Sequence, residues 1–188
     1  MTSKNSFHIT LAESTKDLEQ ILALQQKNHF QNISSEVKDQ EGFVTVVHNL
    51  ELLTSMNSTA KQVIAKDGDE VVGYALVMTE AFQDLIPVLK PMFEMFKDID
   101  FKGKKVTEYT YYVMGQICVA EGYRGSGVFS KMYAKHKEVY ASQFDLCITE
   151  VSTSNKRSMR AHEKVGFVTV HTNADEFDEW NILVWDWE

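Results

Sequence analysis

The sequence is poor in several residue types, and each shortage excludes a class of protein. It contains only two cysteines, Cys118 and Cys147, among 188 residues, and it has no Cys-x-x-Cys or His-Glu-x-x-His spacing. A structural or catalytic zinc site is therefore not expected. Both cysteines lie in apolar runs typical of strands, so we predict two buried, reduced thiols.

Long apolar runs are also missing. No run approaches the about 20 residues that span a bilayer, and residues 1–6 have no apolar core of signal-peptide length. Only two prolines occur, and there is no low-complexity segment and no repeat of fixed period. The composition, 44% hydrophobic and 24% charged, is that of an ordinary globular protein. These features predict one soluble, cytoplasmic domain without a membrane partner.

Basic residues are in deficit, with 19 Lys and Arg against 27 Asp and Glu, and the net charge of −8 argues against nucleic acid as the main partner. Between Gly122 and Lys164, however, eight basic residues stand against four acidic ones. A basic segment in an acidic protein suits a small anionic ligand. Solvated helix faces with a chance imbalance would look the same.

Glycine is sparse, yet three of the nine glycines fall within residues 122–127, Gly-Tyr-Arg-Gly-Ser-Gly. An apolar run, residues 116–120, precedes this loop, and a run with helical periodicity, residues 128–144, follows it. A strand that leads through a glycine-rich loop into a helix is typical of phosphate binding, because glycine allows a close backbone approach and the first helical turn has free N–H groups.

Three nucleotide-binding motifs fail at this loop. A Walker A loop needs Gly-Lys-Ser/Thr at the helix start, but Gly127 is followed by Val128. A dinucleotide fingerprint needs a third glycine where Ser130 stands. A protein-kinase loop would lie near the N-terminus, with VAIK and HRD motifs after it, and neither is present.

The order of expected elements predicts a mixed α/β sheet in a single domain. Residues 79–105 are an apolar, methionine-rich excursion between two strands, for which a lid and a short core helix are both consistent. In the helix expected after the loop, the run of charged neighbours predicts an exposed His136. The expected strands are 7–11, 61–66, 71–78, 107–119, 146–151, 167–172 and 182–187, and the expected helices are 14–28, 49–56, 128–144 and 155–164.

Two segments resemble signatures of one family. Residues 123–128, Tyr-Arg-Gly-Ser-Gly-Val, look like the acetyl-CoA pyrophosphate loop of the GNAT superfamily of N-acetyltransferases. Residues 155–167, Asn-Lys-Arg-Ser-Met-Arg-Ala-His-Glu-Lys-Val-Gly-Phe, closely resemble the family's second signature. The resemblance implies an α/β (α+β) fold, a single GNAT-like domain over residues 1–188 with a mixed, mostly antiparallel sheet flanked by helices.

Within that domain the resemblance implies four units. Residues 1–58 would supply the first strand and the substrate-side helices, 79–105 an insertion or lid, 106–167 the acetyl-CoA-binding core, and 168–188 the closing strands. The implied activity is transfer of the acetyl group of acetyl-CoA, as co-substrate and without a metal, to a primary amine of a small molecule or peptide. The attack would be direct, in a ternary complex. The acidic remainder of the chain suits a cationic acceptor, and the C-terminal tryptophans, Trp180, Trp185 and Trp187, suit either a homodimer edge or completion of the core.

The resemblance also implies a set of donor-binding residues. The backbone of Ile117, Cys118 and Val119 would pair with the pantetheine arm like an added strand. Asn155 would hydrogen-bond the arm or shape the helix start, and Ser158 would lie one turn later on the same face. The N–H groups that would hold the pyrophosphate are those of Arg124, Gly125, Ser126, Gly127, Val128 and Phe129.

Two residues depart from the family pattern. Phe129 stands where glycine or alanine is usual, so its side chain is expected to point into the core. His162 stands where many members have a tyrosine that serves the leaving thiolate. Its ring would either donate to the thiolate or pack inside the helix and satisfy a carbonyl.

The catalytic residues are harder to assign. Glu150 is the candidate general base or amine anchor, and a water chain could serve instead. Glu108 and Gln116 lie on the long strand expected at 107–119, with Gln116 close to the thioester region. His162 is the candidate for the leaving group, with water, Tyr133 or Tyr140 as alternatives. Phe129 and His162 also suit a second class of protein, a non-catalytic CoA or acyl-CoA sensor or degenerate module. A hydrolase is much less favoured, since Gly125-Ser126-Gly127 is not a GxSxG nucleophile elbow.

Overall fold

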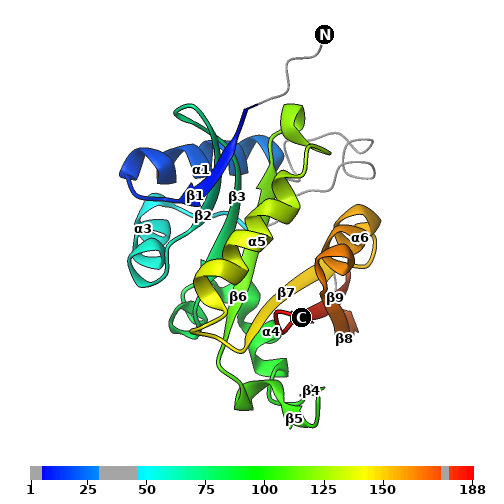
Figure 1. Ribbon diagram of the computed structural model, residues 1–188. Coiled ribbons are helices and arrows are strands. Elements are labelled where there is room, and N and C mark those ends of the chain that lie inside the picture. The colour runs from blue at the N-terminus through cyan, green and yellow to red at the C-terminus, as the bar shows by residue number, and fades with distance from the viewer. Residues whose placement is uncertain (1–5, 30–45, 175–177) are drawn as a thin grey trace.

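The computed structural model describes residues 6–29, 46–174 and 178–188; residues 30–45 of the predicted N-terminal unit lie outside the described part. A sheet with strand order β1-β2-β3-β6-β7-β9-β8 forms the middle of the molecule (Figure 1). Its neighbouring strands are antiparallel except β6 and β7, which are parallel. The predicted fold class is therefore confirmed. The strands of this sheet are β1 (His8–Leu11), β2 (Val63–Asp67), β3 (Glu70–Met78), β6 (Tyr111–Val119), β7 (Leu146–Ser152), β8 (Val168–Ala174) and β9 (Glu179–Trp185).

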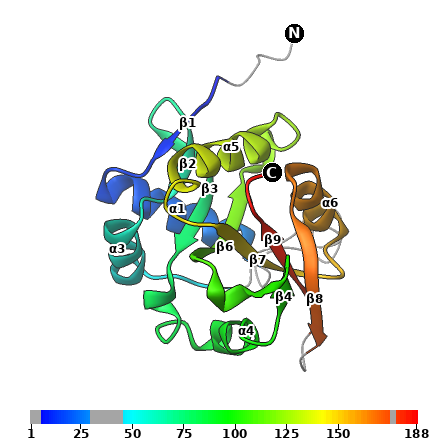
Figure 2. The same cartoon turned by 60° about the horizontal axis from the view of Figure 1, so that its bottom comes forward.

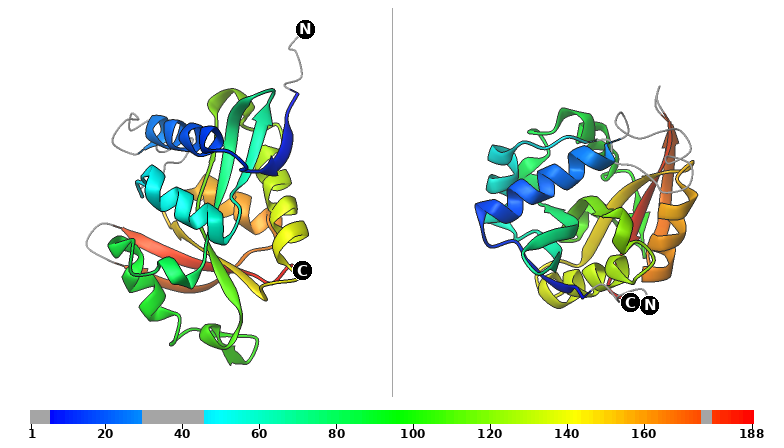
Figure 3. Two further views of the ribbon diagram at one scale, coloured as in Figure 1. Left: turned by 90° about the vertical axis from the view of Figure 1, so that its left-hand side faces the viewer. Right: turned by 90° about the horizontal axis from the view of Figure 1, so that it is seen from above.

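Helices cover both faces of the sheet. Two clusters of buried apolar side chains fill the space between the layers: one joins the sheet to α1, α3 and α4, and the other joins it to α5 and α6. Figure 3 shows α1 and α3 on one side of the strands and α5 and α6 on the other. The helices are α1 (Thr15–Asn28), α3 (Leu50–Thr59), α4 (Lys90–Met95), α5 (Val128–Tyr140) and α6 (Lys156–Val165).

The starts of the helices follow from local side-chain chemistry. Ser14 and Asp17 form a reciprocal capping box at α1, and the Asn49 side chain accepts from the Leu52 N–H at 2.8 Å at the start of α3. Asn155 does the same for α6, where its Oδ1 accepts from the Ser158 N–H at 3.1 Å. At α5 the N-cap is Gly127, and no side chain caps the helix.

The excursion at residues 79–105 lies at one end of the sheet (Figure 2). It contains α4, two short 3-10 turns (Glu80–Phe82 and Pro87–Leu89) and a small hairpin of β4 (Asp100–Phe101) and β5 (Lys104–Lys105). Met92, Phe93 and Phe96 are among its apolar side chains that are buried in the cluster shared with α1 and α3, whereas Leu85 is exposed. Of the two alternatives that the sequence allowed, a short core helix or a lid, this burial corresponds to the core helix. A lid function stays a prediction.

The strand expected from Thr107 was wrong in its first residues. Val106–Glu108 forms a 3-10 turn in which the Glu108 carboxylate accepts from the Lys105 N–H at 2.7 Å, and β6 begins only at Tyr111. A carboxylate that binds a nearby backbone N–H favours a turn over a strand.

The prediction of an exposed His136 was also wrong. Its side chain is fully buried, and its Nδ1 lies 2.8 Å from the Tyr112 hydroxyl. His136 is four residues from both Met132 and Tyr140, so it lies on the apolar stripe of α5 whatever the charge of its sequence neighbours. At the C-terminus, Trp185 and Trp187 pack against each other and the core.

Candidate active site

The site begins where β6 and β7 separate. Their parallel pairing covers three residues on each strand, from Tyr111 opposite Leu146 to Val113 opposite Ile148. The next contact is made by a side chain, because the Thr149 hydroxyl donates to the Met114 carbonyl at 3.0 Å. Beyond this point the two strands diverge as a fork (Figure 1). Residues Gly115–Val119 therefore have no strand partner on the β7 side among the described residues.

A bulge at Gly115 sets which side chains face the fork. On the other side of β6, Gln116 pairs with Leu76 and Met114 with Val77, so Gly115 is an extra residue in its strand. Before the bulge, Val113 points to the α1 face, and after it Cys118 does, so the alternation changes by one residue. The edge of β6 at residues 117–119 has no strand partner on the fork side in the described part of the chain, and binding of the pantetheine arm by Ile117, Cys118 and Val119 stays a prediction.

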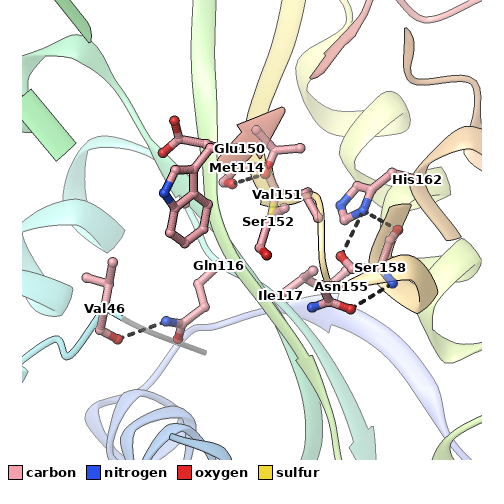
Figure 4. A pocket seen from close by; sticks show the side chains of 13 residues that line it. Val46, Met114, Gln116, Ile117, Glu150, Val151, Ser152, Asn155, Ser158 and His162 are labelled. Carbon is pink, nitrogen blue, oxygen red and sulfur yellow. Dashed lines mark hydrogen bonds between the residues drawn. The ribbon is translucent and has the colours of Figure 1, made fainter. Parts of the chain in front are cut away.

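A small pocket of about 90 Å³ lies in the fork (Figure 4). Its walls come from β6, β7, β9 and the start of α6. Among the described lining residues Glu150 is the only acid, and there is no lysine or arginine. The pocket is lined by Val46, Met114, Gly115, Gln116, Ile117, Thr149, Glu150, Val151, Ser152, Asn155, Ser158, His162 and Trp180.

One wall of this pocket is a buried hydrogen-bond network around Gln116. The Gln116 Oε1 accepts from Tyr74 Oη at 2.6 Å and from Gln25 Nε2 at 2.7 Å, and its Nε2 donates to the Val46 carbonyl at 2.8 Å. The Gln25 amide also lies 2.8 Å from the Nδ1 of His48. Burial lowers the pKa of His48 to about 4, so the ring is neutral and its Nδ1 accepts the amide hydrogen.

This network was missed by the sequence analysis. Its members lie on α1, on the segment before α3, on β3 and on β6, and no motif links them. The one available signal was Gln25, a polar residue on the apolar stripe of α1 formed by Leu18, Ile21 and Leu24. A polar residue at such a position needs a buried partner.

A larger cleft of about 730 Å³ lies between the end of β6, the glycine loop and α6. It shares Ile117, Asn155 and Ser158 with the fork pocket, so the two spaces adjoin. Five cationic side chains and no acidic one line the cleft among the described residues: Arg124, Lys156, Arg157, Arg160 and Lys164.

The glycine loop has the geometry of an anion-binding site. Gly125 and Gly127 adopt φ angles of +76° and +90°, which residues with a side chain rarely adopt. The first turn of α5 has neither a side-chain cap nor an acidic residue. Its N–H groups are therefore available to a ligand, and the helix dipole favours an anion there.

The Arg124 side chain makes contacts within the protein. Its Nε donates to the Val119 carbonyl at 3.0 Å, and its Nη2 donates to the Asn28 Oδ1 at 2.7 Å. These bonds tie the loop to β6 and to the end of α1. Arg124 thus shapes the loop through its side chain.

The two residues that depart from the family pattern contact each other. The rings of Phe129 and His162 lie edge to face with centroids 5.1 Å apart, and both contact Tyr133. The Phe129 side chain is half-buried and packs on the cluster between α5 and the sheet, and Phe129 also lines the cleft.

His162 is a neutral residue with a defined tautomer. Its Nδ1 lies 2.8 Å from the Ser158 carbonyl oxygen, which can only accept, so Nδ1 carries the proton. Burial lowers the pKa of the ring to about 4. This arrangement is the second of the two expected for His162, in which it satisfies a backbone carbonyl. Its Nε2 is buried without a partner among the described residues, and as a lone-pair nitrogen it does not donate to a thiolate.

Neither cysteine is activated. Burial raises the pKa of the Cys118 thiol, which lines the cleft, to about 12, and that of Cys147 to about 12. Both are free and buried, as predicted. A thiol that stays protonated is a poor nucleophile.

Glu150 lies on β7, half-buried in the fork and paired through its backbone with Ile182 of β9. Glu108 is exposed in the turn before β6 and lines neither space. Across the described residues, no group of three His, Cys, Asp or Glu side chains is arranged to hold a metal ion, and no helix is long and apolar enough to cross a membrane.

Comparisons with known proteins identify the fold and the family. Three solved structures share the fold at low sequence identity, and each is aligned over nearly its whole length. The ribosomal-protein-S18-alanine N-acetyltransferase from Escherichia coli is 12% identical, with 95% of this chain and 92% of that chain covered and a TM-score of 0.61. Arabidopsis thaliana Naa50, solved with the bisubstrate analogue CoA-Ac-MVNAL, is 16% identical over 96% and 98%, with a TM-score of 0.61. YncA from Salmonella typhimurium, solved with acetyl-CoA, is 13% identical over 98% and 95%, with a TM-score of 0.62.

At these identities the structures establish the fold alone, and no curated protein sequence matches the chain. The family model is more specific. The model of the acetyltransferase (GNAT) family matches residues 19–167, which include the fork, the glycine loop and α6. The chain therefore belongs to the GNAT family of acetyltransferases.

Proposed function

We propose that this protein is an N-acetyltransferase that transfers the acetyl group of acetyl-CoA to a primary amine of a small molecule or peptide. The observation that carries the proposal is the open edge of β6 at Gly115–Val119, which leads into the uncapped N-terminus of α5. An extended arm that ends in a pyrophosphate fits this succession of an unpaired strand edge and an anion-binding helix end.

In this proposal acetyl-CoA occupies both the cleft and the fork pocket. The arm lies along Ile117, Cys118 and Val119, and the backbone N–H groups of residues 124–129 hold the pyrophosphate. The cations on α6 neutralise the remaining phosphate charge. The acetyl group enters the fork pocket, whose volume of about 90 Å³ suits a small acyl group.

The acceptor amine attacks the thioester carbon directly. The cysteine that lines the cleft keeps its proton, so a covalent acyl-cysteine is not part of the proposal. Glu150 takes the proton that the amine must lose, because it is the carboxylate in the fork pocket. The proposed acceptor is cationic, since its ammonium form approaches a pocket whose formal charge is negative. Structural neighbours include enzymes named for an alanine of a ribosomal protein and a complex with a peptide-based analogue, which supports a peptide as one acceptor class.

A non-catalytic CoA sensor is the second candidate, and one observation favours it. His162 gives its proton to the Ser158 carbonyl, so the side chain at the position of the usual tyrosine does not serve as the thiolate donor. In a sensor the cleft would bind CoA and no amine would be acetylated.

The proposed donor site is tested by thermal stability with and without acetyl-CoA. Acetyl-CoA should raise the melting temperature of the wild type, and Gly127→Asp should abolish the rise because it places a carboxylate against the pyrophosphate. Gly127→Asn introduces similar backbone strain without the charge and should keep part of the rise. Gly103→Asp, at a glycine with φ of +85° in the β4–β5 hairpin, is the matched control away from the cleft. An undiminished rise in Gly127→Asp would refute the assignment of the loop.

A further inference from the structure

We propose that Ser158 is a catalytic residue, whose hydroxyl donates a hydrogen bond to the sulfur of the departing CoA thiolate, and that His162 positions this hydroxyl. The inference rests on the proposed function, since it needs a thioester in the fork. It assigns to a serine the task that a tyrosine one turn later performs in many family members.

Ser158 lies at the junction between the cleft and the fork pocket. In the proposed complex, the pantetheine arm of acetyl-CoA lies in the cleft and the acetyl group lies in the fork pocket. The sulfur atom that joins them therefore lies at the junction between the two spaces. That junction is lined by Ile117, Asn155 and Ser158, which are the residues common to both. Of the three side chains, only Ser158 has a hydroxyl, and Figure 4 shows it on the pocket side of α6, next to the ring of His162.

The hydrogen bond between His162 and Ser158 has a defined direction. The His162 Nδ1 carries a hydrogen, because its partner at 2.8 Å is the Ser158 carbonyl. The same Nδ1 lies 3.3 Å from the Ser158 Oγ. A protonated Nδ1 does not accept, so the serine oxygen is the acceptor of this shared bond and its own hydrogen points elsewhere. In the part of the chain that the structure describes, the Ser158 hydroxyl makes no other hydrogen bond.

Aromatic rings around His162 keep its imidazole neutral. His162 is enclosed by the rings of Phe129, Tyr133 and Phe167, with centroids 5.1 to 5.5 Å away. Burial in this cage disfavours the charged form and lowers the pKa of the ring to about 4. The neutral ring thus keeps one proton, on Nδ1, through the physiological range. The Phe129 side chain, which departs from the family pattern, forms one side of the cage.

The chemical step balances without a further reactant. The amine nitrogen forms a bond to the thioester carbon and the C–S bond breaks, with its electron pair going to sulfur. The proton lost by the amine goes to water by way of Glu150. Ser158 keeps its proton and donates a hydrogen bond that strengthens as the sulfur becomes negative, so it stabilises the transition state more than the bound thioester.

The test measures the pKa of the CoA thiol when it is bound to the protein. The thiolate absorbs in the ultraviolet, and a titration of the CoA complex is corrected with the complex of desulfo-CoA, which has no thiol. In Ser158→Ala the bound thiol should have a pKa about 1 to 2 higher than in the wild type. Its kcat should fall roughly 10- to 100-fold, with little change in the KM for acetyl-CoA.

Three variants make the result specific. Ser158→Thr keeps a hydroxyl and should return the thiol pKa toward the wild-type value. His162→Phe keeps an aromatic ring in the cage but loses the Nδ1 proton, so it should raise the thiol pKa by less than Ser158→Ala. Ser58→Ala removes an exposed helical hydroxyl on α3, which bonds the Ser55 carbonyl, and should change nothing.

The outcomes separate this inference from the proposed function. If the wild type and Ser158→Ala bind CoA with the same thiol pKa, the inference is overturned and the proposed function stands. If the wild type binds no CoA, as judged by thermal stability, both are overturned. A higher thiol pKa in Ser158→Ala, restored in Ser158→Thr, supports the inference even before an acceptor is known.

Discussion

The cleft and the fork pocket adjoin at Ile117, Asn155 and Ser158, yet they differ in size, charge and origin. The cleft measures about 730 Å³ and is lined by five cations without an acid among the described residues. The pocket measures about 90 Å³, and its charged side chain is Glu150. A polyanionic donor matches the first space and an ammonium group matches the second. The proposed acetyl transfer takes place at the junction between the basic cleft and the acidic pocket.

The two regions also differ in how far they could be predicted from sequence. Apart from Asn28, the cleft is lined by two continuous segments, residues 117–130 and residues 155–165. Each segment carries its own signature, because glycines at positive φ and an Asn cap are local requirements. The position and the basic character of the cleft were therefore predicted.

The pocket carries no local signature. Gln25, Tyr74 and Gln116 meet only after α1, β3 and β6 have packed. The strands β6 and β7 separate beyond the bond from the Thr149 hydroxyl to the Met114 carbonyl, and no local pattern marks that point. Sequence reasoning found Glu150 and Gln116 as candidates but not the network that orients Gln116. It also predicted that His136 is exposed, because the charged sequence neighbours were given more weight than the helical spacing, whereas His136 is fully buried.

The fold shows the same contrast on a larger scale. The order of strands and helices was predicted, since turns and caps such as Asp67-Gly68 and Ser14 are read locally. The excursion at residues 79–105 was ambiguous, because its short turns and α4 are held by burial against α1 and α3 rather than by their own periodicity.

The largest effect should come from removing the carboxylate of the pocket. Glu150→Gln keeps the shape of the side chain but removes the proposed base, so kcat should fall on the order of 100-fold or more. The affinity for acetyl-CoA, measured by calorimetry, should stay within about twofold, because Glu150 lines only the pocket. Equal losses in acetyl-CoA affinity and in kcat would contradict the assignment of donor binding to the cleft and of catalysis to the pocket.

A smaller effect should come from reversing charge in the cleft. The double variant Arg160→Glu and Lys164→Glu changes two exposed side chains that line it. Acetyl-CoA should bind about 10-fold more weakly at low salt, and the difference should shrink as salt screens the phosphates. Lys90→Glu with Lys97→Glu, two exposed positions in the excursion at residues 79–105, carries the same change in net charge and should bind like the wild type. Equal weakening in both double variants would show that net charge, rather than the cleft, attracts the donor.

The proposed transferase is tested most directly by thiol release from acetyl-CoA, measured over a panel of primary amines that includes polyamines, amino compounds and short peptides with free N-termini. An N-acetyltransferase should release free CoA at a rate that depends on the amine and saturates with both substrates, and it should produce an equimolar amount of acetylated amine. Tight binding of CoA with no release above the rate of spontaneous hydrolysis for any amine would contradict the proposed transferase and favour the sensor.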